Sequence, residues 1–317
     1  MKGITTFSVL LTCLLFISCK REQPQQVSGC QDFGPRIGIG FGPFWWYVDT
    51  LYQEPAFSRA NPDEFVYYKK IGKDHERVMM KHNLATGESV FLRKGRFSGQ
   101  AEWTKRNEII FSEENGIISK LSADDGKEEV ILIEPGGYQL AVNPDGFKFI
   151  YKPFKTQGVS AYVSDINGNL LDSFTADTAG NRKRNYDFGH WYDDDKVATR
   201  IPGGAGYTDI DNHQSVILFW GEIHQPFRVC ALRYKRQLLF IQEGSIYKVN
   251  MVTQETLLFK EGCDTKHYRS LSVSPDEKWL LVEREHCGNP ASDYILCESR
   301  IYRIDIETGF EQEVRFD

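Results

Sequence analysis

The sequence predicts an all-β fold: a six-bladed β-propeller of four-stranded antiparallel blades. Two observations carry this prediction. A strand–turn–strand pattern recurs six times at a spacing of roughly 40–50 residues, and a second turn signal lies inside most of these units. No helical period is visible outside the first residues of the chain. Four-stranded units repeated around an axis form a propeller.

The recurring unit begins with a short apolar run, continues with a tight polar turn and ends with an alternating strand. The stretches "AVNPDGFKFIYK" (141–152) and "SVSPDEKWLLVERE" (272–285) show it most clearly. Turns of this kind lie at 61–64, 104–108, 143–146, 192–196, 234–237 and 274–278. This spacing is typical of propeller blades.

The second turn signal adds a hairpin to five of the six units. It lies at 85–89, 123–128, 165–169, 252–256 and 307–311, and in all of these except 252–256 an Asn-Gly, Asp-Gly or Thr-Gly step stands between alternating runs. Unit four is the most irregular, because the chain runs through residues 202–214 before the next apolar strand, 215–220. The alternative is a β-sandwich with turns at chance spacing, and the regular recurrence favours the propeller.

The turns that begin at Asn61, Asn143 and Ser274 resemble the repeats of TolB-like propellers, since each has Ser or Asn, then Pro-Asp, then Gly or Glu. The resemblance covers roughly 260 residues. It implies a propeller in the cell envelope. It also implies a binding role, because TolB is a periplasmic scaffold for peptide and protein partners, while other relatives cap peptidases.

The N-terminus has the pattern of a bacterial lipoprotein. An apolar run from Ile4 to Ile17 follows Lys2, and Ser18-Cys19 ends it. Residues 1–18 therefore read as a lipoprotein signal peptide, with cleavage before Cys19 and a lipid on its thiol; the alternative is an ordinary secretory signal. Residues 19–30 read as a flexible tether, and Lys20 favours the outer membrane without deciding the leaflet.

Residues 31–53 precede the six units and 54–317 form the predicted propeller. Residues 31–53 contain Trp45-Trp46-Tyr47, and we expect this N-terminal extension to pack on the propeller, because large aromatic side chains are usually buried. An exposed aromatic platform for sugars is the alternative.

The charge balance limits the choice of partner. The formal net charge is −6, which argues against nucleic acid. We expect a peptide, a glycan or an envelope protein as partner, with membrane attachment through the N-terminal lipid. The longer loops share one face, which gathers basic residues and leads us to expect an anionic ligand there; a solvated basic rim is the alternative. These residues are Lys69, Lys70, Lys73, Arg93, Lys94, Arg96, Arg182, Lys183 and Arg184.

Five cysteines remain after the signal peptide and the lipid-bearing Cys19 are set aside, and an odd number leaves at least one thiol without an intramolecular partner. The disulfide candidates are Cys263, Cys287 and Cys297, paired as Cys287–Cys297 or Cys263–Cys287. The alternatives are free thiols and a Cys/His zinc site that would use the nearby His267 and His286. The spacing matches no standard zinc pattern, and we predict no metal. Cys230 reads as buried, and Cys30 is left unassigned.

The inner strands line the channel, so their polar residues are candidate binding residues. Two places before the turns stand Arg59, Glu102 and His190, which could converge on one ligand group; Ala141, Leu232 and Ser272 hold the same place in the other units. No catalytic motif is present, and we predict neither a catalytic residue nor a cofactor.

The leading function is therefore binding without catalysis. One alternative is a polysaccharide hydrolase or lyase that uses Glu102, Asp187 and His190. Another is a structural scaffold of an outer-membrane complex.

Overall fold

The structure is a computed structural model. It describes residues 44–47, 50–71, 76–132, 137–153, 161–174, 187–201, 204–220, 227–263, 266–287 and 294–316. The lipoprotein signal, the tether and residues 31–43 of the extension lie outside these ranges. Within the described residues, all regular structure is β.

Six sheets of four consecutive antiparallel strands follow one another along the chain. The first three consist of β2 (Thr50–Phe57), β3 (Glu64–Ile71), β4 (Arg77–Asn83) and β5 (Ser89–Gly95); β6 (Glu102–Trp103), β7 (Glu108–Ser112), β8 (Ile118–Ser122) and β9 (Glu128–Leu132); and β10 (Gly137–Val142), β11 (Lys148–Pro153), β12 (Ala161–Asp165) and β13 (Leu170–Phe174). The last three consist of β14 (Asp187–Trp191), β15 (Lys196–Ile201), β16 (Gly204–Asp209) and β17 (Gln214–Trp220); β18 (Phe227–Leu232), β19 (Gln237–Gln242), β20 (Ser245–Asn250) and β21 (Thr256–Lys260); and β22 (Lys266–Val273), β23 (Trp279–Cys287), β24 (Tyr294–Asp305) and β25 (Glu311–Glu313).

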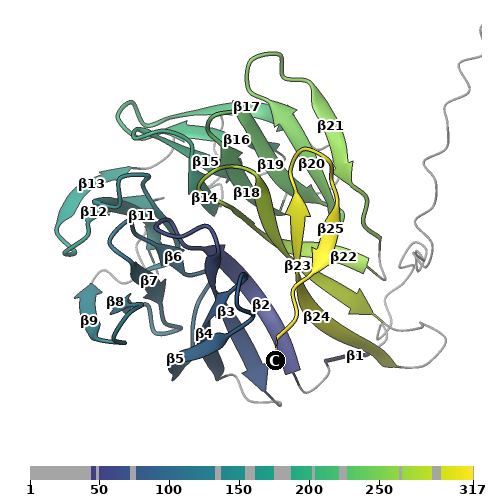
Figure 1. Cartoon of the computed structure of the whole chain (residues 1–317). Helices are drawn as coiled ribbons and strands as arrows, with labels where there is room; N and C mark the ends of the chain where they lie inside the picture. The colour runs from purple at the N-terminus through teal and green to yellow at the C-terminus, as the bar shows by residue number, and fades with distance from the viewer. Residues whose placement is uncertain are drawn as a thin grey trace, which may run out of the picture.

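These sheets are the blades of a ring, and in Figure 1 they follow one another in chain order around it. The prediction of a six-bladed propeller of four-stranded antiparallel blades is confirmed. The first inner strand begins at Thr50, so the predicted boundary at residue 54 lies four residues inside the first blade.

Part of the N-terminal extension adds a strand to the last blade. Strand β1 (Phe44–Tyr47) runs parallel to the start of β24 and pairs with residues 294–297. Figure 1 shows β1 beside β24, far from the middle blades. The backbone of residues 44–47 therefore lies on the sixth sheet.

Apolar side chains between neighbouring blades form the core. Two tryptophans repeat one anchoring contact, because each donates its indole N–H to a backbone carbonyl in the inner strand of the preceding blade. Trp103 Nε1 donates to Ala56 O at 3.0 Å, and Trp191 Nε1 donates to Ala141 O at 2.8 Å. Each tryptophan directly follows a channel-lining residue, so this contact fixes the place of that residue.

The fourth blade is regular, contrary to the irregular unit that the sequence predicts. Residues 204–209 form its third strand, although Gly, Ala and Asp are poor strand formers. A Cβ on Gly204 would lie 2.4 Å from Phe219 O, and one on Gly206 would lie 1.9 Å from Val216 O. The glycines are therefore needed because the next strand approaches closely.

Candidate functional site

The inner strands are bulged where they face the channel. The register of β2, β10 and β18 shifts next to Glu54, Gln139 and Arg228, and all three residues have positive φ, between 49° and 53°. A left-handed conformation costs a non-glycine residue about 1–3 kcal/mol, and such residues cluster at functional sites. The bulges therefore indicate that the channel is a candidate functional site.

One mouth of the channel opens among the Pro-Asp turns and holds a cavity of about 210 Å³. We call it the turn-face mouth. The residues that line it include Arg59, Glu102, His190, Arg233, Tyr234 and Glu277.

The structure brings together the three ionisable residues singled out in the sequence. Arg59 follows β2, Glu102 lies in β6 and His190 lies in β14, so three different blades contribute. Arg59 Nη2 lies 3.3 Å from Glu102 Oε2 and also donates to Val142 O at 2.8 Å. His190 Nε2 lies 3.7 Å from Glu102 Oε1 on the other side of the carboxylate.

Burial decides the ionisation of this trio. Glu102 is only 5% exposed, and burial raises its pKa from 4.5 to about 7 although the charge of Arg59 opposes the rise. Burial also lowers the pKa of His190 to about 3, helped by the charges of Arg59 and Arg228. At neutral pH the trio therefore consists of a guanidinium, a neutral imidazole and a partly protonated carboxyl group, with a net positive charge.

Tyr234 stands at the rim of this mouth and is 75% exposed. Glu277 fixes the turn that carries it, since its carboxylate accepts the backbone N–H groups of Tyr234 at 2.9 Å and Lys235 at 3.3 Å. Glu277 has a φ of 54°, at the place where the equivalent turn has Gly146. A strained, buried glutamate thus holds an exposed aromatic ring at the mouth.

The three residues that hold the same position before the other turns offer no free polar group to the cavity. Ser272 lines the turn-face mouth, but its hydroxyl accepts the N–H of Phe57 at 2.9 Å. Ala141 and Leu232 are fully buried in the core. The repeat therefore supplies polar groups to the cavity from only some of the blades.

The opposite mouth, which we call the loop-face mouth, holds a cavity of about 280 Å³. Glu54 Oε2 lies 3.3 Å from Arg77 Nη1, and Glu54 Oε1 lies 3.1 Å from Arg228 Nη2. Glu283 accepts the N–H of Glu54 at 3.0 Å, and its pKa is raised to about 7 by burial and by the Glu54 charge. Sequence analysis missed these residues, and only Arg228 carried a signal there, as a charge inside an otherwise apolar strand.

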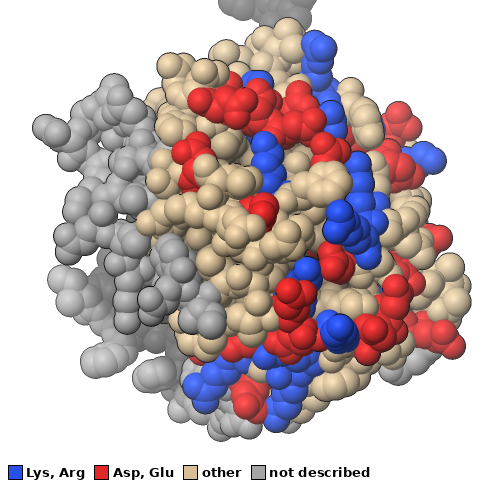
Figure 2. Space-filling view, turned by 90° about the vertical axis from the view of Figure 1, so that its left-hand side faces the viewer, with Lys and Arg blue, Asp and Glu red and all other residues tan. Residues whose placement is uncertain are grey.

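The predicted basic face is partly neutralised. Arg93 forms ion pairs with Glu113 and Glu128, and Lys94 forms one with Glu76. Figure 2 shows acidic and basic side chains interspersed on the side it presents. Lys73, Arg182, Lys183 and Arg184 lie outside the described residues. The arrangement of Arg93 and Lys94 therefore gives no support to an anion site at these two residues.

The structure pairs Cys287 with Cys297, whose Cα atoms are 4.1 Å apart on neighbouring strands. The alternative Cys263–Cys287 pairing is wrong. Cys263 is itself disulfide-bonded, and Cys230 is a free, buried thiol whose pKa is raised by burial.

Some predicted features cannot be placed. Ser18, Cys19 and Cys30 lie outside the described residues, and so does the side chain of Asp187. Among the described residues there is no helix with the length and hydrophobicity needed to cross a bilayer.

Comparisons with known proteins bear on the fold. No family model and no curated protein matches the sequence. Among solved structures, a protein assigned as TolB from Agrobacterium tumefaciens superimposes with a TM-score of 0.58 at 13% identity, covering 77% of this chain and 90% of its own. A chain of a nidogen–laminin complex gives 0.54 at 10% identity, covering 83% and 91%. Likeness at this level shows the fold alone, and this chain has a β-propeller fold similar to that of these two structures.

Proposed function

We propose that this chain is a lipid-anchored envelope protein whose propeller binds a peptide, glycan or protein partner at the turn-face mouth without catalysis. The observation that carries the proposal is the convergence of Arg59, Glu102 and His190 in one cavity, from three blades. The lipobox at Ser18-Cys19 supports the anchor, and Lys20 supports the outer membrane.

The chemistry of the trio favours a ligand group that accepts hydrogen bonds or carries negative charge. Arg59 supplies a guanidinium, which suits a carboxylate through paired N–H donors. Glu102 adds a donor when it is protonated, because its pKa is raised to about 7. A carboxylate at the end of a peptide, or on an acidic sugar, fits this set.

The size of the cavity favours one end of a larger partner. Its volume of about 210 Å³ is below the range of roughly 300–1,000 Å³ typical of sites that enclose a whole small molecule. Tyr234 stands outside the cavity and offers a flat ring for the next part of the partner. The nidogen–laminin structure, by its description, contains a complex between proteins, so a fold of this kind is compatible with protein recognition.

One observation favours an enzyme as the second candidate. A glutamate with a pKa near 7 beside a neutral histidine is the pairing that general acid–base catalysis uses. Under this alternative, a hydrolase or lyase would act on a polysaccharide. Glu102→Gln combined with His190→Ala would abolish its turnover, whereas a binding protein so changed need not lose its partner.

Ligand-dependent melting tests the proposal. The chain from residue 19 onward, with Cys19→Ser, is melted with peptides that carry a free carboxyl terminus, with the same peptides amidated, and with acidic and neutral oligosaccharides. A ligand at about a hundred times its Kd stabilises by about 2.7 kcal/mol. We expect stabilisation by one acidic class and its loss in Arg59→Ala.

A flat response to every probe would refute ligand binding at this mouth and would favour the scaffold alternative. A response that Arg59→Ala leaves unchanged would move the site elsewhere on the molecule.

A further inference from the structure

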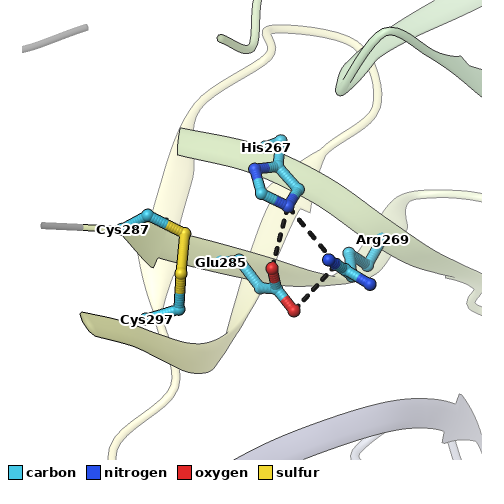
Figure 3. Close-up of a disulfide and its surroundings, with 5 residues drawn as sticks. All are labelled: His267, Arg269, Glu285, Cys287 and Cys297. Carbon is cyan, nitrogen blue, oxygen red and sulfur yellow. Dashed lines mark hydrogen bonds and ion pairs between the residues drawn. A yellow bond between two sulfur atoms is a disulfide. The ribbon is translucent and has the colours of Figure 1, made fainter. Parts of the chain in front are cut away.

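A histidine, a glutamate and a cysteine share one face of the sixth blade beside the loop-face mouth. His267 of β22 pairs directly with Glu285 of β23, so their side chains lie on the same face. Cys287 stands two residues after Glu285 on the same strand and therefore points to that face as well. Figure 3 shows the three together with Arg269. One ligand atom from each lies within 4.8 Å of the others.

The imidazole of His267 and the carboxylate of Glu285 lie at ion-pair distance. His267 Nε2 lies 2.8 Å from Glu285 Oε2, yet this oxygen has no hydrogen-bond partner, although Glu285 is only 2% exposed. Arg269 Nε lies 2.7 Å from Glu285 Oε1 and 3.3 Å from His267 Nε2. A metal ion held between His267 and Glu285 would give the buried Glu285 Oε2 the partner that it lacks.

We propose that reduction of the Cys287–Cys297 disulfide completes a zinc site formed by His267, Glu285 and Cys287. In the oxidised protein the sulfur of Cys287 is bonded to Cys297 and offers no thiolate. A dithiol reductant transfers two electrons and two protons to the disulfide and becomes a disulfide itself. The thiol of Cys287 then releases its proton as it binds the metal.

Zinc is the metal that suits these ligands. Imidazole nitrogen, carboxylate oxygen and thiolate sulfur are its usual protein ligands, and three of them leave a fourth position for water. The other nearby candidates are excluded. His286 points to the opposite face, where its Nε2 lies 3.0 Å from Tyr302 Oη. Cys297 stands on β24, one strand farther from His267 than Cys287.

This site goes beyond the proposed binding function and lies at the other mouth of the channel. Glu285 and Arg269 both line the loop-face mouth. A metal on Glu285 would weaken its ion pair with Arg269, so the redox state of one disulfide would change the charge presented at this opening.

Two cysteine variants test the site. Cys297→Ser leaves Cys287 as a thiol beside His267 and Glu285, whereas Cys287→Ser leaves the thiol one strand away. Each is titrated with cobalt(II), which reports thiolate ligation by a near-ultraviolet charge-transfer band, and with zinc in competition with a chromophoric chelator. We expect the band and one tightly bound zinc in Cys297→Ser, and zinc binding weaker by more than about 100-fold in Cys287→Ser.

Further controls make each outcome decisive. Adding His267→Ala to Cys297→Ser should weaken zinc binding by at least about 10-fold. If Cys297→Ser does not fold, the wild-type protein reduced with a dithiol replaces it and is compared with reduced Cys287→Ser. Equal binding by both cysteine variants, or no thiolate band in Cys297→Ser or the reduced wild type, would overturn the proposal. So would equally tight zinc binding by the oxidised wild type.

Discussion

Replacing Glu102 with Gln should change how the stability of the propeller depends on pH. Because burial raises the Glu102 pKa from 4.5 to about 7, the folded protein keeps a proton that the unfolded chain releases between these pH values. This contribution to stability is fully present below the unfolded pKa and is lost as pH rises through about 7. The shift corresponds to about 3 kcal/mol.

Gln does not titrate and resembles the protonated carboxyl in shape. The free energy of unfolding of Glu102→Gln, relative to wild type, should therefore rise by about 3 kcal/mol between pH 4.5 and about pH 8. The assay is urea unfolding of both proteins at the two pH values. The difference between them removes the contribution of every other titrating group.

His190→Asn is the control of opposite sign. The pKa of His190 is lowered from 6.5 to about 3, so its contribution is present above the unfolded pKa and is lost as pH falls toward 3. This variant should gain relative to wild type on acidification. Parallel pH profiles for Glu102→Gln and wild type would refute the claim that burial in this mouth keeps Glu102 protonated near neutrality.

Four further variants, one of them a control, have expected effects on stability. Gly189→Ala places a Cβ 1.7 Å from a backbone oxygen of the next blade and should lower the stability in a thermal melt by more than about 3 kcal/mol. Gly126→Ala, at a φ of +71° with nothing within 4 Å, should cost only about 1–2 kcal/mol, and similar losses would contradict the steric argument. Trp103→Phe removes a buried hydrogen bond of 3.0 Å and should cost about 2 kcal/mol in chemical unfolding; no loss would show that the bond does not anchor the blade. Replacing Cys287 and Cys297 together by Ala opens a closure that spans 10 residues, and calorimetry should show about 2–3 kcal/mol less stability; an unchanged melting temperature would argue against the disulfide.

The architecture could be predicted because its signals are local. In the turn that begins at Asn143, the side-chain oxygen accepts the N–H groups of Phe147 and Lys148, both at 3.0 Å, and Gly146 supplies a φ of 77°. Such turns are encoded by a few adjacent residues, so they can be recognised without tertiary information. Strand β16 could not, because its glycines are required by the close approach of β17.

Part of the candidate site could also be predicted from the sequence. Arg59, Glu102 and His190 each stand two residues before a turn that ends an inner strand. Because inner strands line the channel, this position alone identified them as candidates. Glu54 and Arg228 could not be predicted by counting residues back from the turn, because a bulge in each strand changes which residue faces the channel. The position of a bulge depends on pairing with the next strand, which a single sequence does not display.

Site-specific photo-crosslinking in intact cells can show whether a partner occupies the turn-face mouth. A photoreactive phenylalanine derivative replaces Tyr234 at the rim of the turn-face mouth, and in a control it replaces Val252, which is 68% exposed in the β20–β21 turn. We predict an adduct at position 234, its loss when Arg59→Ala is added, and none at position 252. Equal labelling at both positions, or an adduct at neither, would contradict binding at this mouth.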